Sequence, residues 1–218
     1  ALLIKDQFPG STITLLTMGP PRAVEILREG FYRGADDGIL LTDRAFAGSD
    51  TLATSYAISC AIRKIKNVDI IVCGRQAIDG DTAQVGPQVA EKLGIPQITY
   101  AEEIVSLKEN KIRVKRRLER GVEIVECVLP VLITVNSSAP RCRPRNATAI
   151  ANTHLTIKEW SVNNIDADPI QLGLGGSPTK VKKVDNIVFQ SKESRTLEDF
   201  DEDIDGLMNE LIEAHIIG

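Results

Sequence analysis

The sequence has few of the residue patterns on which hydrolytic and metal-dependent enzymes depend. Its two histidines, His154 and His215, stand in no metal-binding or Ser/His/Asp pattern. Its four cysteines, at positions 60, 73, 127 and 142, are not closely paired, and three of them lie within apolar runs. This spacing fits neither a disulfide framework nor a zinc site, so we expect reduced cysteines in a cytoplasmic protein. We expect no catalytic residue and no metal ligand.

Long apolar runs and an excess of positive charge are also lacking. No apolar stretch approaches the ~20 residues that cross a membrane, and no signal peptide is visible, so we expect no membrane insertion. The net charge of −4 argues against nucleic acid as a partner. The basic residues between Lys111 and Arg120 alternate with apolar ones, which is typical of one solvated strand face.

The sequence does contain an alternation of strand-like and helix-like segments. Strands are predicted at Thr12–Thr17, Gly38–Thr42 and Val68–Cys73, and helices at Arg22–Arg33, from a cap at Ser49 or Asp50 to Lys66, and at Gln84–Leu93. This order predicts an α/β fold with a parallel sheet and right-handed crossovers. Ala1–Lys5 is typical of the last turns of a helix, so we also expect residues before Ala1.

The pattern then changes to successive strands. They are predicted at Ile98–Leu107, Lys111–Leu118, Val122–Cys127 and Val131–Val135, with Asn110 and Gly121 at tight turns. Hairpins are therefore added to the parallel sheet. A final helix is predicted from Leu197 to His215.

The segment from Val68 to Ala90 is the most informative. Its strand leads into a loop that contains Gly74 and Gly80, and residues 82–84 open a helix. Such glycines allow a close backbone approach, and N–H groups at a helix start bind phosphate. An ordinary turn with a cap from Asp79 or Asp81 explains the loop equally well, because no GxGxxG or Walker pattern is present. Met18 also ends a parallel strand, where ligands of such sheets bind, and this modestly favours a ligand site.

Several segments resemble the beta (small) subunit of electron transfer flavoproteins. The longest, CGRQAIDGDTAQVGPQVAEKLGIPQITYAEEI, covers residues 73–104. Four others agree in order: TMGPP at 17–21, RGADDGILLTDRAFAGSDTLATSYA at 33–57, VKRRLERGVEIVECVLPVLIT at 114–134 and LGLGGSPTKVKKV at 172–184. The resemblance therefore spans nearly the whole chain.

The resemblance implies a Rossmann-like nucleotide-binding domain, similar to adenine-nucleotide hydrolase folds, in a heterodimer with an alpha subunit. It places this domain at residues 1–185 and an arm and helix that contact the partner at 186–218. FAD is expected, because Gly80 and Thr82 are typical of electron-bifurcating members, and AMP is the alternative. The cofactor-binding residues carried over by matched motif are Met18, Gly74, Arg75, Gln76, Ala77, Ile78, Asp79, Gly80, Asp81, Thr82, Ala83, Gln84 and Val85.

The resemblance also implies a function. The chain is expected to be an electron-transfer subunit of an oxidoreductase complex, not an independent enzyme. It would pass electrons between NADH, ferredoxin and a partner flavin dehydrogenase. Two alternatives stay open beside the AMP-binding, non-bifurcating type: a stand-alone adenine-nucleotide-binding module, and an enzyme of the ATP-pyrophosphatase type.

The sequence departs from the family at Arg120, where the family usually has glycine or an acidic residue, and in two segments that bear on function. The loop by which the family recognises its dehydrogenase normally carries a tyrosine and a leucine that residues 139–145 lack. We therefore expect Pro140, Arg141, Arg143 and Arg145 to dock a different dehydrogenase. The family also has an N-terminal strand and an Asn-Pro loop that contribute to the nucleotide site. We expect such a segment to precede Ala1. If it were truly absent, the sheet would lose a central strand and nucleotide binding would be impaired.

Overall fold

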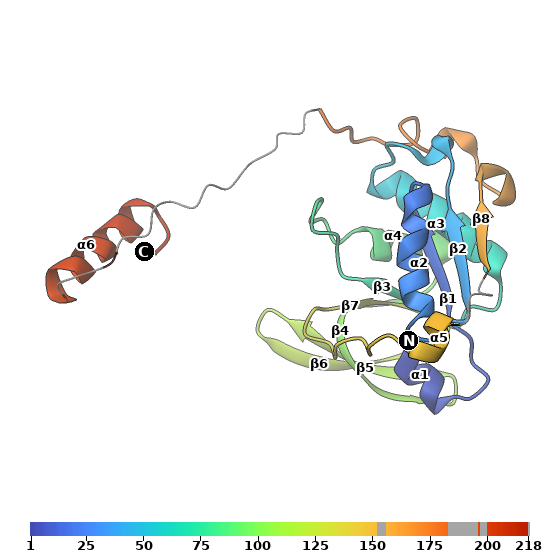
Figure 1. Cartoon of the computed structure of the whole chain (residues 1–218), viewed down its shortest axis with the longest axis horizontal. Helices are drawn as coiled ribbons and strands as arrows, with labels where there is room; N and C mark the ends of the chain where they lie inside the picture. Colours follow the sequence, from blue (N-terminus) through green and yellow to red (C-terminus); the bar gives the residue numbers. More distant parts are fainter. Residues whose placement is uncertain (152–155, 183–195, 197–199, 218) are drawn as a thin grey trace. The chain divides into compact units, whose positions relative to one another are not determined.

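The computed structural model describes residues 1–151, 156–182, 196 and 200–217 (Figure 1). The chain divides into two units, Ala1–Lys180 and Val181–Gly218. The second unit contains helix α6 (Phe200–Glu213), whose partly exposed apolar residues include Ile204, Leu207 and Met208. The remaining elements belong to the first unit.

The first sheet has three parallel strands in the order β1-β2-β8. They are β1 (Thr14–Met18), β2 (Asp37–Leu41) and β8 (Ile157–Trp160). Helix α2 (Val24–Phe31) packs on this sheet and brings the Phe31 ring against Gly38, where an added Cβ would lie 2.7 Å from the ring. Strand β8 was not predicted, because its four residues have charged side chains at the centre and no apolar run.

The second sheet has five strands in the order β3-β7-β4-β5-β6. They are β3 (Ile70–Gly74), β7 (Val131–Val135), β4 (Gln97–Lys108), β5 (Lys111–Leu118) and β6 (Gly121–Val128). β3 and the start of β4 pair with β7 in parallel, whereas β4, β5 and β6 form antiparallel hairpins. The predicted α/β fold with added hairpins is confirmed.

The parallel strands lie in two sheets rather than in one continuous sheet. β1 and β3 each have a single hydrogen-bonded neighbour, so both are edge strands. Helix α3 (Thr51–Ile65) packs against both sheets. Its Ala57 and Ala61 meet the apolar cluster of the first sheet, and its Ile58 and Ile62 meet the cluster around Leu132 of the second.

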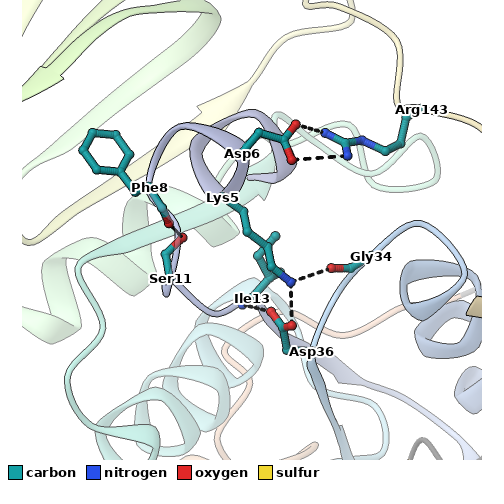
Figure 2. A network of polar contacts seen from close by, with 8 residues as sticks. All are labelled: Lys5, Asp6, Phe8, Ser11, Ile13, Gly34, Asp36 and Arg143. Carbon is teal, nitrogen blue, oxygen red and sulfur yellow. Dashed lines mark hydrogen bonds and ion pairs between the residues drawn. The ribbon is translucent and has the colours of Figure 1, made fainter.

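Helix α1 (Leu2–Gln7) is joined to the first sheet by polar contacts (Figure 2). Lys5 Nζ donates to the Gly34 carbonyl at 3.0 Å and forms an ion pair with Asp36. Asp36 in turn accepts from the Ile13 N–H at 2.8 Å, just before β1 begins. The pKa of Asp36 is lowered, because these hydrogen bonds outweigh the opposing effect of its burial.

The remaining helices of the first unit are α4 (Val85–Leu93) and the short α5 (Ala147–Ala151). Single turns of 3-10 helix lie at Pro21–Ala23, Arg44–Phe46, Val162–Asn164 and Pro169–Gln171. All four cysteines are free, and burial raises the pKa of the Cys73 thiol to about 11.

Substituting Gly86→Ala should destabilise the protein. An added Cβ would lie 2.7 Å from Cγ2 of Thr134, a side chain only 2% exposed. Overpacking costs about 1–3 kcal/mol, which exceeds the ~1 kcal/mol that alanine gains over glycine in a helix. After this gain is subtracted, we expect urea denaturation to show a free energy of unfolding lower by up to about 2 kcal/mol.

Gly80→Ala is the matched control, because its added Cβ would meet no atom within 4 Å. The two variants should differ clearly in their urea midpoints. Equal midpoints would contradict the close approach of α4 to β7.

Candidate functional site

The residues expected to bind a cofactor lie at the carboxyl ends of the parallel strands. Met18 ends β1, Gly74 ends β3, and residues 75–84 connect β3 to helix α4. The side chain of Met18 packs against the apolar cluster of the first sheet, so it is held within the protein. Ligands of open parallel sheets bind at such an edge.

Helices α3 and α4 begin side by side at this edge. The Thr51 hydroxyl donates to the Gln84 side chain at 3.0 Å, and one turn later the Ser55 hydroxyl donates to Gln88 at 3.0 Å. Two helix N-termini therefore point the same way, and each carries a partial positive charge.

The first of these N-termini is satisfied within the protein. Asp50 accepts from the N–H groups of Leu52 at 2.9 Å and Ala53 at 3.1 Å, which confirms it as the cap of α3. The same carboxylate accepts from the backbone and the hydroxyl of Thr179, at 3.0 and 2.8 Å. A protein carboxylate thus already occupies the place that an anion would take at α3.

The second N-terminus is open. The N-cap of α4 is Gln84, and its side chain makes no capping hydrogen bond. The alternative in which Asp79 or Asp81 caps this helix is wrong: Asp79 accepts from the Gly80 N–H at 2.9 Å, and Asp81 accepts from the Gln76 side chain. The first turn of α4 can therefore donate N–H groups to an external anion.

The loop before α4 suits a nucleotide. An added Cβ on Gly74 or Gly80 would meet nothing within 4 Å, so no packing within the protein explains these glycines. Ile78 is 99% exposed and offers an apolar surface. Arg75 adds a positive charge, and Thr82 adds a hydroxyl. This donor set fits a phosphate with an apolar ring beside it.

Sequence reasoning missed Tyr100 as a neighbour of this loop. The guanidinium carbon of Arg75 lies 5.7 Å from the centre of the Tyr100 ring. Arg75 follows β3, and Tyr100 lies 25 positions later on β4. In the sheet, β7 lies between these two strands. No signal in the residue pattern marks this contact, because it depends on a positive φ of +59° at Tyr100.

The arginines expected to dock a partner make ion pairs within the chain. Arg143 forms a two-pronged contact with Asp6, with Nη1–Oδ1 at 3.4 Å and Nη2–Oδ2 at 2.5 Å (Figure 2). Arg145 binds Glu29 in the same manner, with Nε–Oε2 at 3.0 Å and Nη2–Oε1 at 2.6 Å. The hydrogen bond from Arg143 lowers the pKa of Asp6. Arg141, by contrast, is exposed and makes no ion pair with any described residue.

The start of the same loop is anchored by a buried carboxylate. Glu102, 8% exposed, accepts hydrogen bonds from the Ser138 hydroxyl and from Arg117 Nε at 2.8 Å. The hydrogen bond from Ser138 has the largest effect on the pKa of Glu102, and the one from Arg117 the next largest; both lower it. At the other end, the Asn146 N–H donates to the Tyr32 carbonyl at 2.7 Å. The loop therefore joins the two sheets and is held at both ends.

The chain is similar to known proteins over most of its length. Residues 1–163 match the family model of the electron transfer flavoprotein domain. The chain belongs to the electron transfer flavoprotein family. Family membership implies association with a flavin or other nucleotide and with a partner subunit.

Three curated relatives illustrate the similarity. The electron transfer flavoprotein subunit beta of Clostridium acetobutylicum is 48% identical over 184 residues, which cover 84% of this chain and 70% of the relative. The caffeyl-CoA reductase-Etf complex subunit CarD of Acetobacterium woodii is 44% identical, with 83% and 69% covered. Protein FixA of Azotobacter vinelandii is 46% identical, with 93% and 74% covered.

In the part of the chain that the structure describes, no three His, Cys, Asp or Glu side chains are grouped as metal ligands. None of the helices described has the length and apolarity needed to span a bilayer. His154 lies outside the described residues.

Substituting Glu102→Gln should change how stability depends on pH. A carboxylate whose pKa is lowered by folding stabilises the protein above its unfolded pKa of about 4.3, and this contribution is lost as the pH falls through the folded value. The variant should therefore melt below the wild type at pH 7, and the gap should close toward pH 3. Thermal melting across this range measures it.

Glu103→Gln is the control, since the Glu103 side chain is exposed and 4.0 Å from Lys115. Its melting temperature should stay close to that of the wild type at every pH. A Glu102→Gln deficit that persists unchanged to pH 3 would show that the anchor does not depend on the charge of Glu102.

Proposed function

We propose that this chain is the small subunit of a heterodimeric, electron-bifurcating electron transfer flavoprotein. In this role it binds FAD at the carboxyl edge of the second sheet and exchanges electrons with NADH, ferredoxin and a partner flavin dehydrogenase. The observation that carries the proposal is the uncapped start of α4, which lies within the longest segment that resembles the family, residues 73–104. The chain is an electron-transfer subunit within a complex, not a separate enzyme.

Two observations favour FAD over AMP as the ligand: the small residues Gly80 and Thr82 in the loop, and the names of two relatives. Gly80 and Thr82 are small residues of the loop just before the helix start, and an added Cβ on Gly80 would meet no atom within 4 Å. Among the relatives, one is named as a subunit of a caffeyl-CoA reductase-Etf complex and another as a FixA protein. A flavin needs more room beyond its phosphates than AMP does, and the open space around Gly74 and Gly80 agrees with that need.

The residues of this chain supply binding and position. The N–H groups of Val85 and Gly86 and the positive end of α4 would hold phosphate oxygens. Arg75 adds charge, and Ile78 gives an apolar contact. FAD, when bound, supplies the redox chemistry itself.

The number of flavins per heterodimer tests this proposal. The purified complex should release two FAD per heterodimer on denaturation, as measured by absorbance and chromatography. One FAD with one AMP would contradict bifurcation and leave the family assignment intact. A colourless homodimer that binds ATP would instead favour a stand-alone adenine-nucleotide module.

The loop at residues 139–145 is proposed to dock the dehydrogenase through Pro140, Arg141, Arg143 and Arg145. Exposed ion pairs such as Arg143–Asp6 contribute little to stability, because water screens both charges. An acidic partner surface can therefore compete with Asp6 and Glu29 at low cost. Arg141 needs no such exchange, since it is already exposed and unpaired among the described residues.

Charge reversal in this loop should slow docking. Arg143→Glu and Arg145→Glu together, and Arg141→Glu alone, should each lower the second-order rate of electron transfer to the dehydrogenase by about threefold or more at low salt. The difference should shrink at high salt, because the Debye length shortens. Stopped-flow measurement of flavin reduction gives the rate.

Two control variants separate a docking role of the loop arginines from other effects of charge. Arg113→Glu removes an exposed cation on β5, outside the loop, and should leave the rate unchanged. Asp6→Ala frees Arg143 and should leave docking unchanged or faster. Unchanged rates in all the arginine variants of the loop would refute the docking role, and a slower Asp6→Ala variant would show that Arg143 acts only by holding the loop.

A further inference from the structure

Strand β4 has an irregularity next to the candidate site. Its pairing with β7 shifts register between Ile98 and Ala101, and Tyr100 within the shift has a φ of +59°. This left-handed conformation is rare for an aromatic residue, and such strain is kept where the surrounding structure enforces it. The register shift therefore needs specific supports.

Two side chains from neighbouring strands supply that support. The Tyr100 N–H donates to Thr134 Oγ1 of β7 at 3.1 Å, and Arg116 of β5 donates to Thr99 Oγ1 at 3.1 Å. Thr134 is only 2% exposed, so its hydroxyl has little freedom to turn elsewhere. The irregular backbone is thus held on both sides.

The irregularity places the Tyr100 ring beside Arg75. The distance of 5.7 Å from the guanidinium carbon to the ring centre lies within the range of a cation–π interaction. The Arg75 N–H donates to the Val135 carbonyl at 3.1 Å, so the backbone of Arg75 is also fixed at the end of β7. Both ends of the Arg75 side chain are therefore restrained.

Thr134 connects this pair to the start of α4. The methyl group of Thr134 packs closely on Gly86, since a Cβ added to that glycine would lie 2.7 Å from it. The hydroxyl of Thr134 accepts a hydrogen bond from the Tyr100 N–H. The first turn of α4, Thr134 and Tyr100 are therefore contiguous. The charge of Arg75 is held at the same edge as the open helix N-terminus.

We infer that Tyr100 is a positioning residue that holds the Arg75 guanidinium at the carboxyl edge, ready to contact an adenine-nucleotide phosphate. This inference rests on the proposed function. A long arginine side chain loses rotamer freedom when it binds a ligand. A ring that already restricts the free side chain reduces that loss and raises nucleotide affinity.

Two substitutions separate the ring from the backbone. Tyr100→Phe keeps the aromatic face. Tyr100→Asn removes the face but tolerates a positive φ better than most residues. Titration calorimetry of the heterodimer, after its exchangeable nucleotide is removed, should give wild-type AMP affinity for Tyr100→Phe and about two- to fivefold weaker affinity for Tyr100→Asn. Adenosine, which lacks the phosphate, should bind all three proteins equally.

A double substitution tests whether Tyr100 acts through Arg75. Arg75→Met should weaken AMP binding, and adding Tyr100→Asn to it should cause no further loss. This inference alone is overturned by any of three results: Tyr100→Asn weakens AMP binding equally in the wild-type and Arg75→Met proteins, it weakens adenosine binding as much as AMP binding, or it leaves AMP affinity unchanged. A wild-type complex that binds neither AMP nor FAD overturns the proposed function itself.

Discussion

The arrangement of this molecule depends on helix α3, which packs on two sheets at once. Its alanines Ala57 and Ala61 allow close approach to the first sheet, and its isoleucines contact the second. The buried Ser55 and Ser59 are compatible with this position because their hydroxyls bond to helix carbonyls. Ser55 also bonds to Gln88, which sets α4 alongside. The orientation of α3 therefore determines where the start of α4 lies.

The chemistry of the candidate site follows from a difference between these two helices. Asp50 neutralises the start of α3 from within the chain, whereas the start of α4 has no capping side chain. An anion gains most where N–H donors and the helix dipole are uncompensated. The same contrast is the reason for proposing that a nucleotide phosphate binds at α4 and not at α3, although both helices begin at one edge.

Much of this could be predicted from the residues, and the exceptions have physical reasons. The parallel strands, the hairpins and the Asp50 cap follow from local patterns of apolar and capping residues. Strand β8 could not be predicted, because its four residues include two charged ones and show no strand pattern. It forms a strand through its backbone pairing with β2, which the local sequence does not reveal. The open start of α4 could not be predicted either, because Asp79 and Asp81 have the right chemistry for a cap and only their placement excludes it. The ion pairs of Arg143 and Arg145 join residues more than 100 positions apart.

The sequence by itself determined the fold class and the family and indicated the segment of the candidate site, because periodicity and motif order are local properties of the chain. Only the tertiary structure decided which helix N-terminus stays open and which arginines are already paired. It also decided that Tyr100 faces Arg75. These features depend on distances between separate strands and helices, and such distances arise only when the two sheets pack against α3.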